Sequence, residues 1–317
     1  MPHSVRAFAP ASVSNVASGF DIMGFALDAI GDTVTARMSP VPGVRIVRVT
    51  GHAEGISLDA GENTAGPPAL ELCRRRGPEC GVELEIHKGF ASGSGLGSSA
   101  ASAAAAAVAC DALLQTGLSK EELLECALHG EELASGARHA DNVAPALLGG
   151  FVLVRGYEPL DVVQLNVPEM LWCAIVRPHL SISTRASRLS LPTTVPLRDV
   201  VKQTGNAAGL VAGLLTGDLA LVSRSLHDVI AEPHRAGAIS GFPEIKQAAL
   251  AAGALGCSIS GSGPAVFALA GDRQHAERSV RAMAAVLDRH HMPHDTYLSR
   301  VNRRGARVLP PESDATR

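Results

Sequence analysis

Aromatic residues are scarce in this chain: one Trp, two Tyr and seven Phe make up 3% of its 317 residues. A large core can still form, because 46% of the residues are hydrophobic, but it must be built from Ala, Val, Leu and Ile. Only 19% of the residues are charged, which argues against global disorder. The length fits one large domain or two of ordinary size.

An excess of positive charge is also missing. The formal net charge is −3, and the short basic run at residues 74–76 is typical of a solvated helix end, so nucleic acid is not expected as a partner. The longest apolar run, residues 100–114, is too short to cross a bilayer and contains Asp111. The first residues lack the apolar stretch of a signal peptide. We therefore expect a cytoplasmic protein without a membrane partner.

The six cysteines form no Cys-x-x-Cys pair and have no metal-ligand spacing with histidine. Most of them stand in apolar surroundings, which predicts reduced, buried thiols in a reducing compartment. Three histidines, His290, His291 and His294, lie close together near the end of the chain. We interpret them as the polar end of a helix rather than as a metal site.

One glycine-rich segment, residues 93–99 (Gly-Ser-Gly-Leu-Gly-Ser-Ser), lies between a strand-like run at 82–86 and an alanine-rich run that ends near Leu114. A strand, a glycine loop and a helix start together indicate a phosphate site, because the helix N-terminus offers unpaired N–H groups and glycine lets a ligand approach closely. The segment lacks the Lys-Ser/Thr of a Walker A loop and the spacing of the dinucleotide-binding fingerprint. A turn that binds no ligand is the alternative, since a single glycine motif is weak evidence.

The order of helical and extended patterns predicts an α+β protein with two domains. A capping box at Ser119 begins one helix, and Gly136 ends it. In the first half we expect strands at 4–8, 46–49, 82–86 and 149–154, with an extended segment that follows Asp21 and runs through Leu27 and Val34. We expect helices there at 63–76, 98–114 and 119–136. In the second half we expect strands at 171–176, 257–260, 265–270 and 296–301, and helices at 197–215, 218–230, 243–252 and 274–289. The domains should comprise residues 1–160 and 161–305, with a flexible polar tail at 306–317.

Two further segments rich in Gly and Ser, residues 10–21 and 256–264, flank the glycine loop at a distance in the sequence. The ordered triple resembles the GHMP kinase superfamily over nearly the whole chain. Within that superfamily three other segments resemble homoserine kinases, namely the H-x-D-N-x-A-P, S-T-x-x-x-R and D-x-I-x-E-P-x-R patterns at residues 139–145, 183–188 and 228–235. The usual proline before the loop is replaced by Ala91, which puts the rigidity of the loop in doubt but not the chemistry.

The resemblance implies a two-domain GHMP kinase fold, with an N-terminal domain like the second domain of ribosomal protein S5 and a ferredoxin-like C-terminal domain. It implies ATP- and Mg²⁺-dependent phosphorylation of L-homoserine to O-phospho-L-homoserine in threonine biosynthesis, and it is compatible with a homodimer. The alternatives are another GHMP kinase, acting on mevalonate, a sugar or shikimate, and a non-catalytic ligand-binding protein on the same scaffold.

The resemblance also assigns the nucleotide side of the site. Ser99 and Glu131 correspond to the metal ligands, and phosphoryl transfer needs Mg²⁺ because the β- and γ-phosphates must be neutralised. The phosphate loop corresponds to Gly93, Ser94, Gly95, Leu96, Gly97, Ser98 and Ser99, and Asn63 is expected to line the adenine pocket. Lys88, just before the loop, is expected to add positive potential to the phosphates, with a solvated lysine at a strand end as the alternative.

The substrate side corresponds to five residues with complementary chemistry. Arginine binds a carboxylate in two places at once, and an ammonium group needs an acid, so Asp21 corresponds to the acid. Asn142 would lie near the attacking hydroxyl; because an amide cannot take up a full proton, we expect catalysis by Asn142 and Arg188 through positioning and electrostatic stabilisation. The residues that correspond to the homoserine site are Asn15, Asp21, His139, Arg188 and Arg235.

Overall fold

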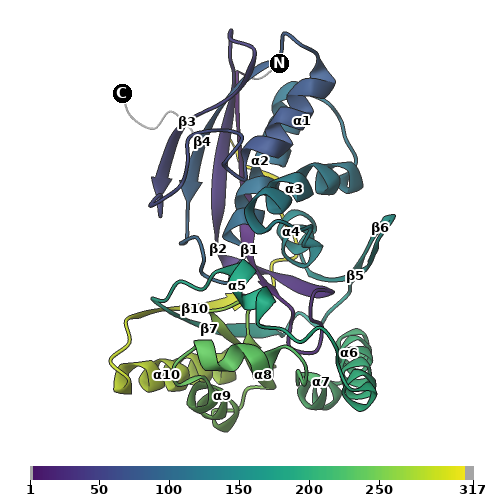
Figure 1. The fold of residues 1–317 in the computed structure, drawn as a ribbon, viewed down its shortest axis with the longest axis vertical. Coiled ribbons are helices and arrows are strands. Elements are labelled where there is room, and N and C mark those ends of the chain that lie inside the picture. The colour runs from purple at the N-terminus through teal and green to yellow at the C-terminus, as the bar shows by residue number, and fades with distance from the viewer. Residues whose placement is uncertain (1–2, 311–317) are drawn as a thin grey trace.

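The computed structural model describes residues 3–310, which fold into two adjoining α+β layers (Figure 1). The N-terminal sheet has seven strands and the order β11-β1-β2-β4-β3, with β5 and β6 extending it from β2. The parallel pair β3–β4 is joined through a helix, and the other neighbours are antiparallel. The strands are β1 (Ser4–Ser14), β2 (Met23–Met38), β3 (Gly43–Gly51), β4 (Gly81–Lys88), β5 (Phe151–Tyr157), β6 (Leu160–Leu165) and β11 (Arg307–Val308).

Four helices cover one face of this sheet (Figure 1). The alanine-rich helix lies in the middle, in contact with β1, β2 and the other three helices, and nearly every residue of it is buried. Its methyl side chains permit this close approach, which explains how the domain forms a core with so few aromatic residues. The helices are α1 (Gly66–Arg76), α2 (Ser98–Leu114), α3 (Lys120–Ser135) and α4 (Ala140–Leu148).

The C-terminal sheet has four antiparallel strands in the order β10-β7-β9-β8, which with the intervening helices is the ferredoxin-like arrangement. Its strands are β7 (Trp172–Pro178), β8 (Gly256–Ile259), β9 (Val266–Ala270) and β10 (His294–Arg300). Its helices are α5 (Thr184–Leu189), α6 (Leu197–Thr216), α7 (Leu219–Ser225), α8 (Glu232–Arg235), α9 (Phe242–Ala251) and α10 (Arg273–Arg289), with a 3₁₀ turn η1 at Ala236–Ala238. The predicted two-domain α+β fold is confirmed.

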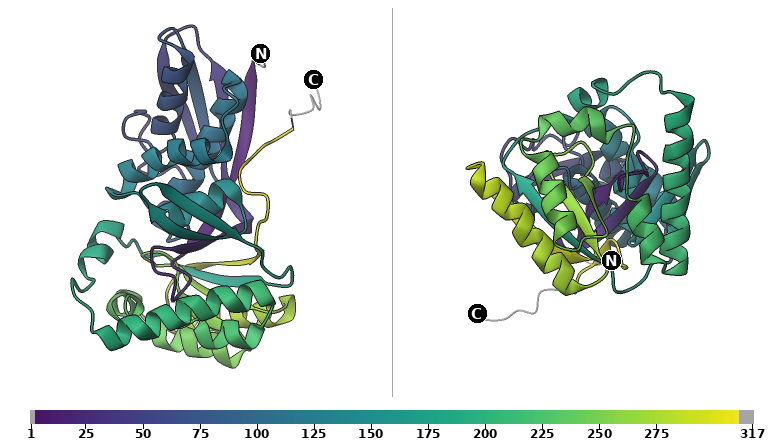
Figure 2. Two further views of the ribbon diagram at one scale, coloured as in Figure 1. Left: turned by 90° about the vertical axis from the view of Figure 1, so that its right-hand side faces the viewer. Right: turned by 90° about the horizontal axis from the view of Figure 1, so that it is seen from below.

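A shared core joins the two domains. The ring of Phe25 on β2 stacks on Phe151 of β5, with centroids 4.5 Å apart, and meets the edge of Phe267 on β9 at 6.1 Å. The chain also returns after β10: Val301 bridges to Leu27, and β11 then pairs with β1 (Figure 2). The relative placement of the domains is therefore fixed by both apolar contacts and backbone pairing.

Several expected boundaries are wrong, each for a tertiary reason. The first strand continues to Ser14, because β2 pairs with it across a bulge after Pro10. The N-terminal sheet continues to Leu165, beyond the expected boundary at 160, because β6 pairs with β5. The helix expected at 218–230 ends at Ser225, because the Asp228 carboxylate accepts from the backbone of residues 230–232 and starts α8 instead.

The expected tail at 306–317 is also wrong where the structure describes it, since residues 307–308 belong to β11; residues 311–317 lie outside the described part.

The predicted capping box is confirmed, with Ser119 and Glu122 bonded reciprocally. All six cysteines are free and buried, as predicted. His290 ends α10 and contacts Glu244 at 3.2 Å. Within residues 3–310 no helix is long and apolar enough to cross a membrane.

Candidate active site

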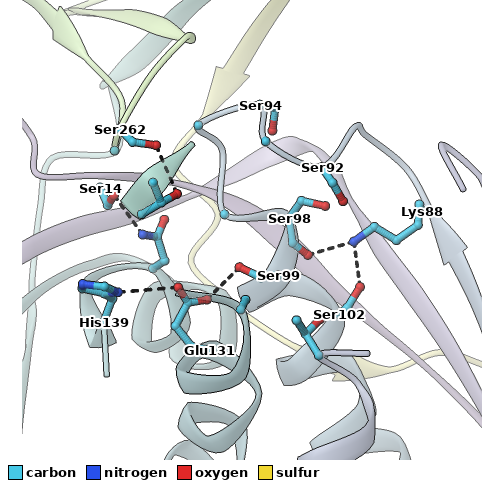
Figure 3. A pocket seen from close by; sticks show the side chains of 18 of the residues that line it. Ser14, Lys88, Ser92, Ser94, Ser98, Ser99, Ser102, Glu131, His139 and Ser262 are labelled. Atoms are coloured by element: carbon cyan, nitrogen blue, oxygen red, sulfur yellow. Dashed lines mark hydrogen bonds and ion pairs between the residues drawn. The ribbon is translucent and has the colours of Figure 1, made fainter. Parts of the chain in front are cut away.

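A cavity of about 500 Å³ lies where the two domains meet (Figure 3). One side is formed by the start of α2, the end of α3 and the start of α4, and the other side by α5, α8 and the 261–262 turn. All but one of the residues assigned from the sequence line it, which supports the choice of segments. These are Asn15, Asp21, Asn63, Lys88, Gly93, Ser94, Gly95, Gly97, Ser98, Ser99, Glu131, His139, Asn142, Arg188 and Arg235. The exception is Leu96, whose side chain is fully buried in the core between the domains.

The glycine loop ends at the N-terminus of α2, where the pattern predicted it. Gly93, Gly95 and Gly97 all have left-handed φ values, of 66°, 78° and 69°. A Cβ at Gly95 would lie 2.8 Å from the carbonyl oxygens of Ser260 and Gly263, so the loop can close against the C-terminal domain only with glycine there. No side chain caps the first turn of α2, which leaves its N–H groups available to an anion.

Lys88 lies in the cavity wall, but its amine is occupied behind the loop. Its Nζ pairs with the fully buried Asp32 and donates to the Ser98 carbonyl and the Ser102 hydroxyl, both at 2.8 Å (Figure 3). Burial lowers the pKa of Lys88. Because Asp32 neutralises the ammonium group, Lys88 holds the start of α2 in place rather than offering positive potential to phosphates, which corrects the expectation.

Asn63 also has a local explanation. Its amide donates to the Ser57 carbonyl at 2.8 Å and accepts from the Ala65 N–H at 3.0 Å, which fixes the loop before α1. The side chain is 4% exposed. Asn63 therefore shapes one wall of the cavity through the 57–65 loop.

The two residues that correspond to metal ligands are in contact. The Ser99 hydroxyl on α2 donates to Oε2 of Glu131 on α3 at 2.7 Å, and both face the cavity (Figure 3). A hydroxyl and a carboxylate oxygen suit Mg²⁺, which typically takes one or two protein ligands and completes its shell with phosphates and water. No group of three or more His, Cys, Asp or Glu side chains suited to a metal occurs within residues 3–310. The donor set thus fits Mg²⁺ held jointly with a nucleotide.

The opposite end of the cavity holds a chain of charged groups. Arg188 donates from Nη1 and Nη2 to the two oxygens of Asp21, each at 2.8 Å, and Nη2 lies 2.7 Å from Nε2 of His139. Nδ1 of His139 in turn faces Oε1 of Glu131 at 3.8 Å, and this hydrogen-bonding carboxylate raises the pKa of His139. The Asp21 pairing raises the pKa of Arg188. Arg235 donates to the Gly261 carbonyl at 2.8 Å, and burial lowers its pKa.

Asn142 is fixed by the end of β1. The Ser12 hydroxyl donates to Oδ1 of Asn142 at 2.9 Å, and Nδ2 of Asn142 donates to the Ser14 hydroxyl at 2.9 Å. These bonds join α4 to β1 across sequence separations of 130 and 128 residues. The amide is thereby held in one orientation in the cavity wall, beside Gly97 of the glycine loop.

Comparison with known proteins agrees with this geometry. The chain matches the family descriptions "GHMP kinases N terminal domain" at residues 63–150 and "GHMP kinases C terminal" at residues 210–289. It is 46% identical to the homoserine kinase of Chlorobium phaeovibrioides, with 96% of this chain and 99% of the relative aligned. The crystal structure of homoserine kinase from Cytophaga hutchinsonii has a TM-score of 0.94 and 48% identity, covering 98% of each chain. The chain belongs to the homoserine kinase family of GHMP kinases.

More distant relatives mark the limits of the likeness. A mevalonate kinase from L. major superimposes with a TM-score of 0.71 at 17% identity, over 93% of this chain and 95% of that one. At this identity the match shows the shared fold alone. Family membership therefore rests on the relatives of higher identity.

Asp141 is a cavity residue that the sequence analysis missed. Its side chain is 2% exposed, and its Oδ1 has no hydrogen-bond partner among the described residues. Burial, reinforced by the negative charge of Asp21, raises the pKa of Asp141 to about 7. The signal was present in the segment 139–142, where His139 and Asn142 were assigned and the acid that lies between them in the sequence was not.

The loop that carries Asn15 and Asp21 is strained. Asn15, Val16 and Ala17 are consecutive residues with positive φ values of 69°, 40° and 56°, and Asp21 has φ 59°. For a β-branched residue such as Val16 this conformation is rare and costs about 1–3 kcal/mol. The loop is held by Asn15, which donates to the Gly261 carbonyl at 2.9 Å and accepts from the Asp21 N–H at 3.0 Å. The strained backbone conformation thus lowers the stability of the fold, but it places the side chains of Asn15 and Asp21 in the cavity wall.

Proposed function

We propose that this protein transfers the γ-phosphoryl group of ATP to the hydroxyl group of L-homoserine. One observation carries the proposal: a single cavity joins an uncapped helix start behind a glycine loop to a cluster of two arginines and two acids. The first end suits a triphosphate, and the second suits a zwitterionic amino acid. Membership of the homoserine kinase family supports the same substrate pair.

At the nucleotide end, the loop of residues 93–99 receives the phosphates on the N–H groups of α2. Ser99 and Glu131 would hold Mg²⁺, which when bound neutralises charge on the β- and γ-phosphates. The hydroxyl–carboxylate hydrogen bond between them keeps both oxygens on the phosphate side of the cavity.

At the amino-acid end, homoserine exchanges partners with an existing ion pair. Arg188 and Asp21 are bonded in two places, so a bound carboxylate takes Arg188 and a bound ammonium group takes Asp21. Arg235 supplies a second cation for the carboxylate, and Asp141 supplies a second acid close to Asp21. This exchange explains why an arginine and an acid that both serve the substrate contact each other here.

Catalysis in this proposal rests on positioning. The amide of Asn142, oriented by Ser12 and Ser14, directs the substrate hydroxyl toward the γ-phosphate. An amide cannot accept a full proton, so the hydroxyl proton leaves late, to solvent or to the phosphate. Electrostatic stabilisation of the transferring group by the loop N–H groups lowers the barrier.

A coupled assay of ADP release tests the proposal against its alternatives, with homoserine, mevalonate, galactose and shikimate as acceptors. We expect release with homoserine alone. Mevalonate and shikimate lack the ammonium group that the acids require, and galactose lacks both charges. If ADP release does not depend on homoserine, the proposal is wrong. The contact between Ser99 and Glu131 speaks against a non-catalytic binding protein, which has no need of metal ligands.

In this proposal the protein is a cytoplasmic homodimer, as the resemblance to the family implies. Its two domains divide between β6 and β7, since β6 pairs with the N-terminal sheet and β7 begins the C-terminal one. Light scattering during size-exclusion chromatography tests the dimer, and limited proteolysis between residues 165 and 172 tests the division.

A further inference from the structure

The ring of Phe20 contacts both arginines of the amino-acid end. The guanidinium carbon of Arg188 lies over its ring at 5.7 Å from the centroid, and that of Arg235 lies over it at 5.0 Å. The arginines come from α5 and α8, whereas Phe20 belongs to the strained loop after β1. One aromatic ring therefore contacts two cations that are distant in the sequence.

The two guanidinium groups repel each other, and the partners of Arg188 offset its positive charge more than the partners of Arg235 do. Arg188 forms an ion pair with Asp21, whereas Arg235 donates to the Gly261 carbonyl and contacts the ring of Phe20. Burial lowers the pKa of Arg235. The charge of Asp21 acts in the opposite direction, and the charge of Arg188 lowers the pKa further. The electron-rich face of an aromatic ring offsets such repulsion without supplying an acid that would compete for the arginines.

Both arginines also have an N–H donor without an acceptor. Nε of Arg188 and Nε of Arg235 are buried and have no hydrogen-bond partner among the described residues. A buried donor without an acceptor is unfavourable, and a carboxylate is the group that two neighbouring guanidinium groups can share. The arrangement is thus organised before a carboxylate binds, with the ring of Phe20 in contact with both guanidinium groups.

We propose that Phe20 is a positioning residue for the substrate carboxylate, and that its ring holds the guanidinium groups of Arg188 and Arg235 in place through two cation–π contacts. The inference rests on the proposed function and adds a determinant of substrate affinity to it. A leucine would fill similar volume but lacks the ring quadrupole, whereas a tyrosine retains it.

Steady-state kinetics of Phe20→Leu and Phe20→Tyr test the proposal. Two partly desolvated cation–π contacts correspond to a rise in the homoserine KM of roughly fivefold to thirtyfold for the leucine variant. The ATP KM and the kcat at saturating homoserine should change by less than about twofold, and the tyrosine variant should resemble the wild type. An unchanged homoserine KM in Phe20→Leu, or an equal rise in both KM values, overturns the proposal.

A fluorinated series separates the ring quadrupole from packing. Replacing Phe20 with mono-, di- and trifluorophenylalanine changes the volume little, while each fluorine withdraws electron density from the ring face. We expect log KM for homoserine to rise stepwise with the number of fluorines at constant Tm. A flat series means that Phe20 acts only by filling space, and the proposal is then wrong.

A ligand without a carboxylate supplies the last control. 3-Aminopropan-1-ol is homoserine without that group, so its inhibition constant against homoserine should be the same in the wild type and in Phe20→Leu. An equal loss for both ligands assigns the effect to general distortion and overturns the proposal. A wild-type protein with no homoserine-dependent ADP release defeats the proposed function itself, whereas an active wild type with an insensitive position 20 defeats this inference alone.

Discussion

Replacing Asp141 with asparagine should stabilise the protein at neutral and alkaline pH. The carboxyl group is fully buried, and Oδ1 has no hydrogen-bond partner among residues 3–310. Burial and the charge of Asp21 raise its pKa from 3.8 to about 7. Asparagine has nearly the same shape but no charge, so the substitution removes the cost of ionising the group in the folded state.

The sign and size follow from proton linkage. Between about pH 4 and pH 7 the folded state keeps the proton on Asp141, whereas the unfolded state has lost it. Unfolding therefore releases a proton, and the free energy of unfolding falls by about 1.4 kcal/mol per pH unit across this window. The total is about 4 kcal/mol at pH 8 and less than about 1 kcal/mol at pH 4, and Asp141→Asn should recover that difference.

Urea denaturation without added substrates, at pH 4, 6 and 8, measures the effect. Asp288→Asn is the matched control, because the Asp288 side chain is 73% exposed and should show no such trend. The reasoning is refuted if the stability difference between Asp141→Asn and the wild type does not grow with pH. The same variant should bind homoserine more weakly, since it removes an acid from the amino-acid end, and calorimetry would detect this.

Three further predictions concern the other parts of the site. Lys88→Met leaves the buried Asp32 carboxylate without a cation and should lower the free energy of unfolding by about 3–5 kcal/mol in urea, and adding Asp32→Asn should restore most of it; no recovery contradicts the pairing. Ser99→Ala should raise the Mg²⁺ concentration for half-maximal activity by about tenfold, and an unchanged value excludes Ser99 as a ligand. Asn142→Ala should lower kcat by about a hundredfold in the coupled assay, and a loss of only a few-fold contradicts its central role.

Patterns that are local in the chain led to correct predictions. The glycine loop and the start of α2 were found because strand, glycines and helix follow one another within a few residues. The capping box at Ser119 is equally local. The cavity residues were found by a different route, since Arg188 and Asp21 are 167 residues apart and only the resemblance to a family joined them.

Properties that arise from tertiary packing were missed. Lys88 looked available to phosphates because Asp32, 56 residues earlier, gives no sign in the sequence that it lies beside the amine. Leu96 was assigned to the nucleotide because the whole loop was, although its side chain packs into the core. Asp141 was passed over because burial and the lack of a partner for Oδ1 are facts of packing.

The pairing of Arg188 with Asp21 also bears on selectivity. Homoserine has no net charge, so replacing this one ion pair with an arginine–carboxylate and an acid–ammonium contact leaves no charge without a partner. A ligand that lacks one of the two charges separates the pair and leaves one of these groups without a partner. Because the Arg188 and Asp21 side chains are 39% and 31% exposed, solvent screens the unpaired charge, and the cost is on the order of 1 kcal/mol. That penalty corresponds to roughly fivefold weaker binding. The charges that mevalonate, shikimate and sugars leave unpaired therefore add to the affinity that these molecules lose through their missing contacts with the arginines and acids.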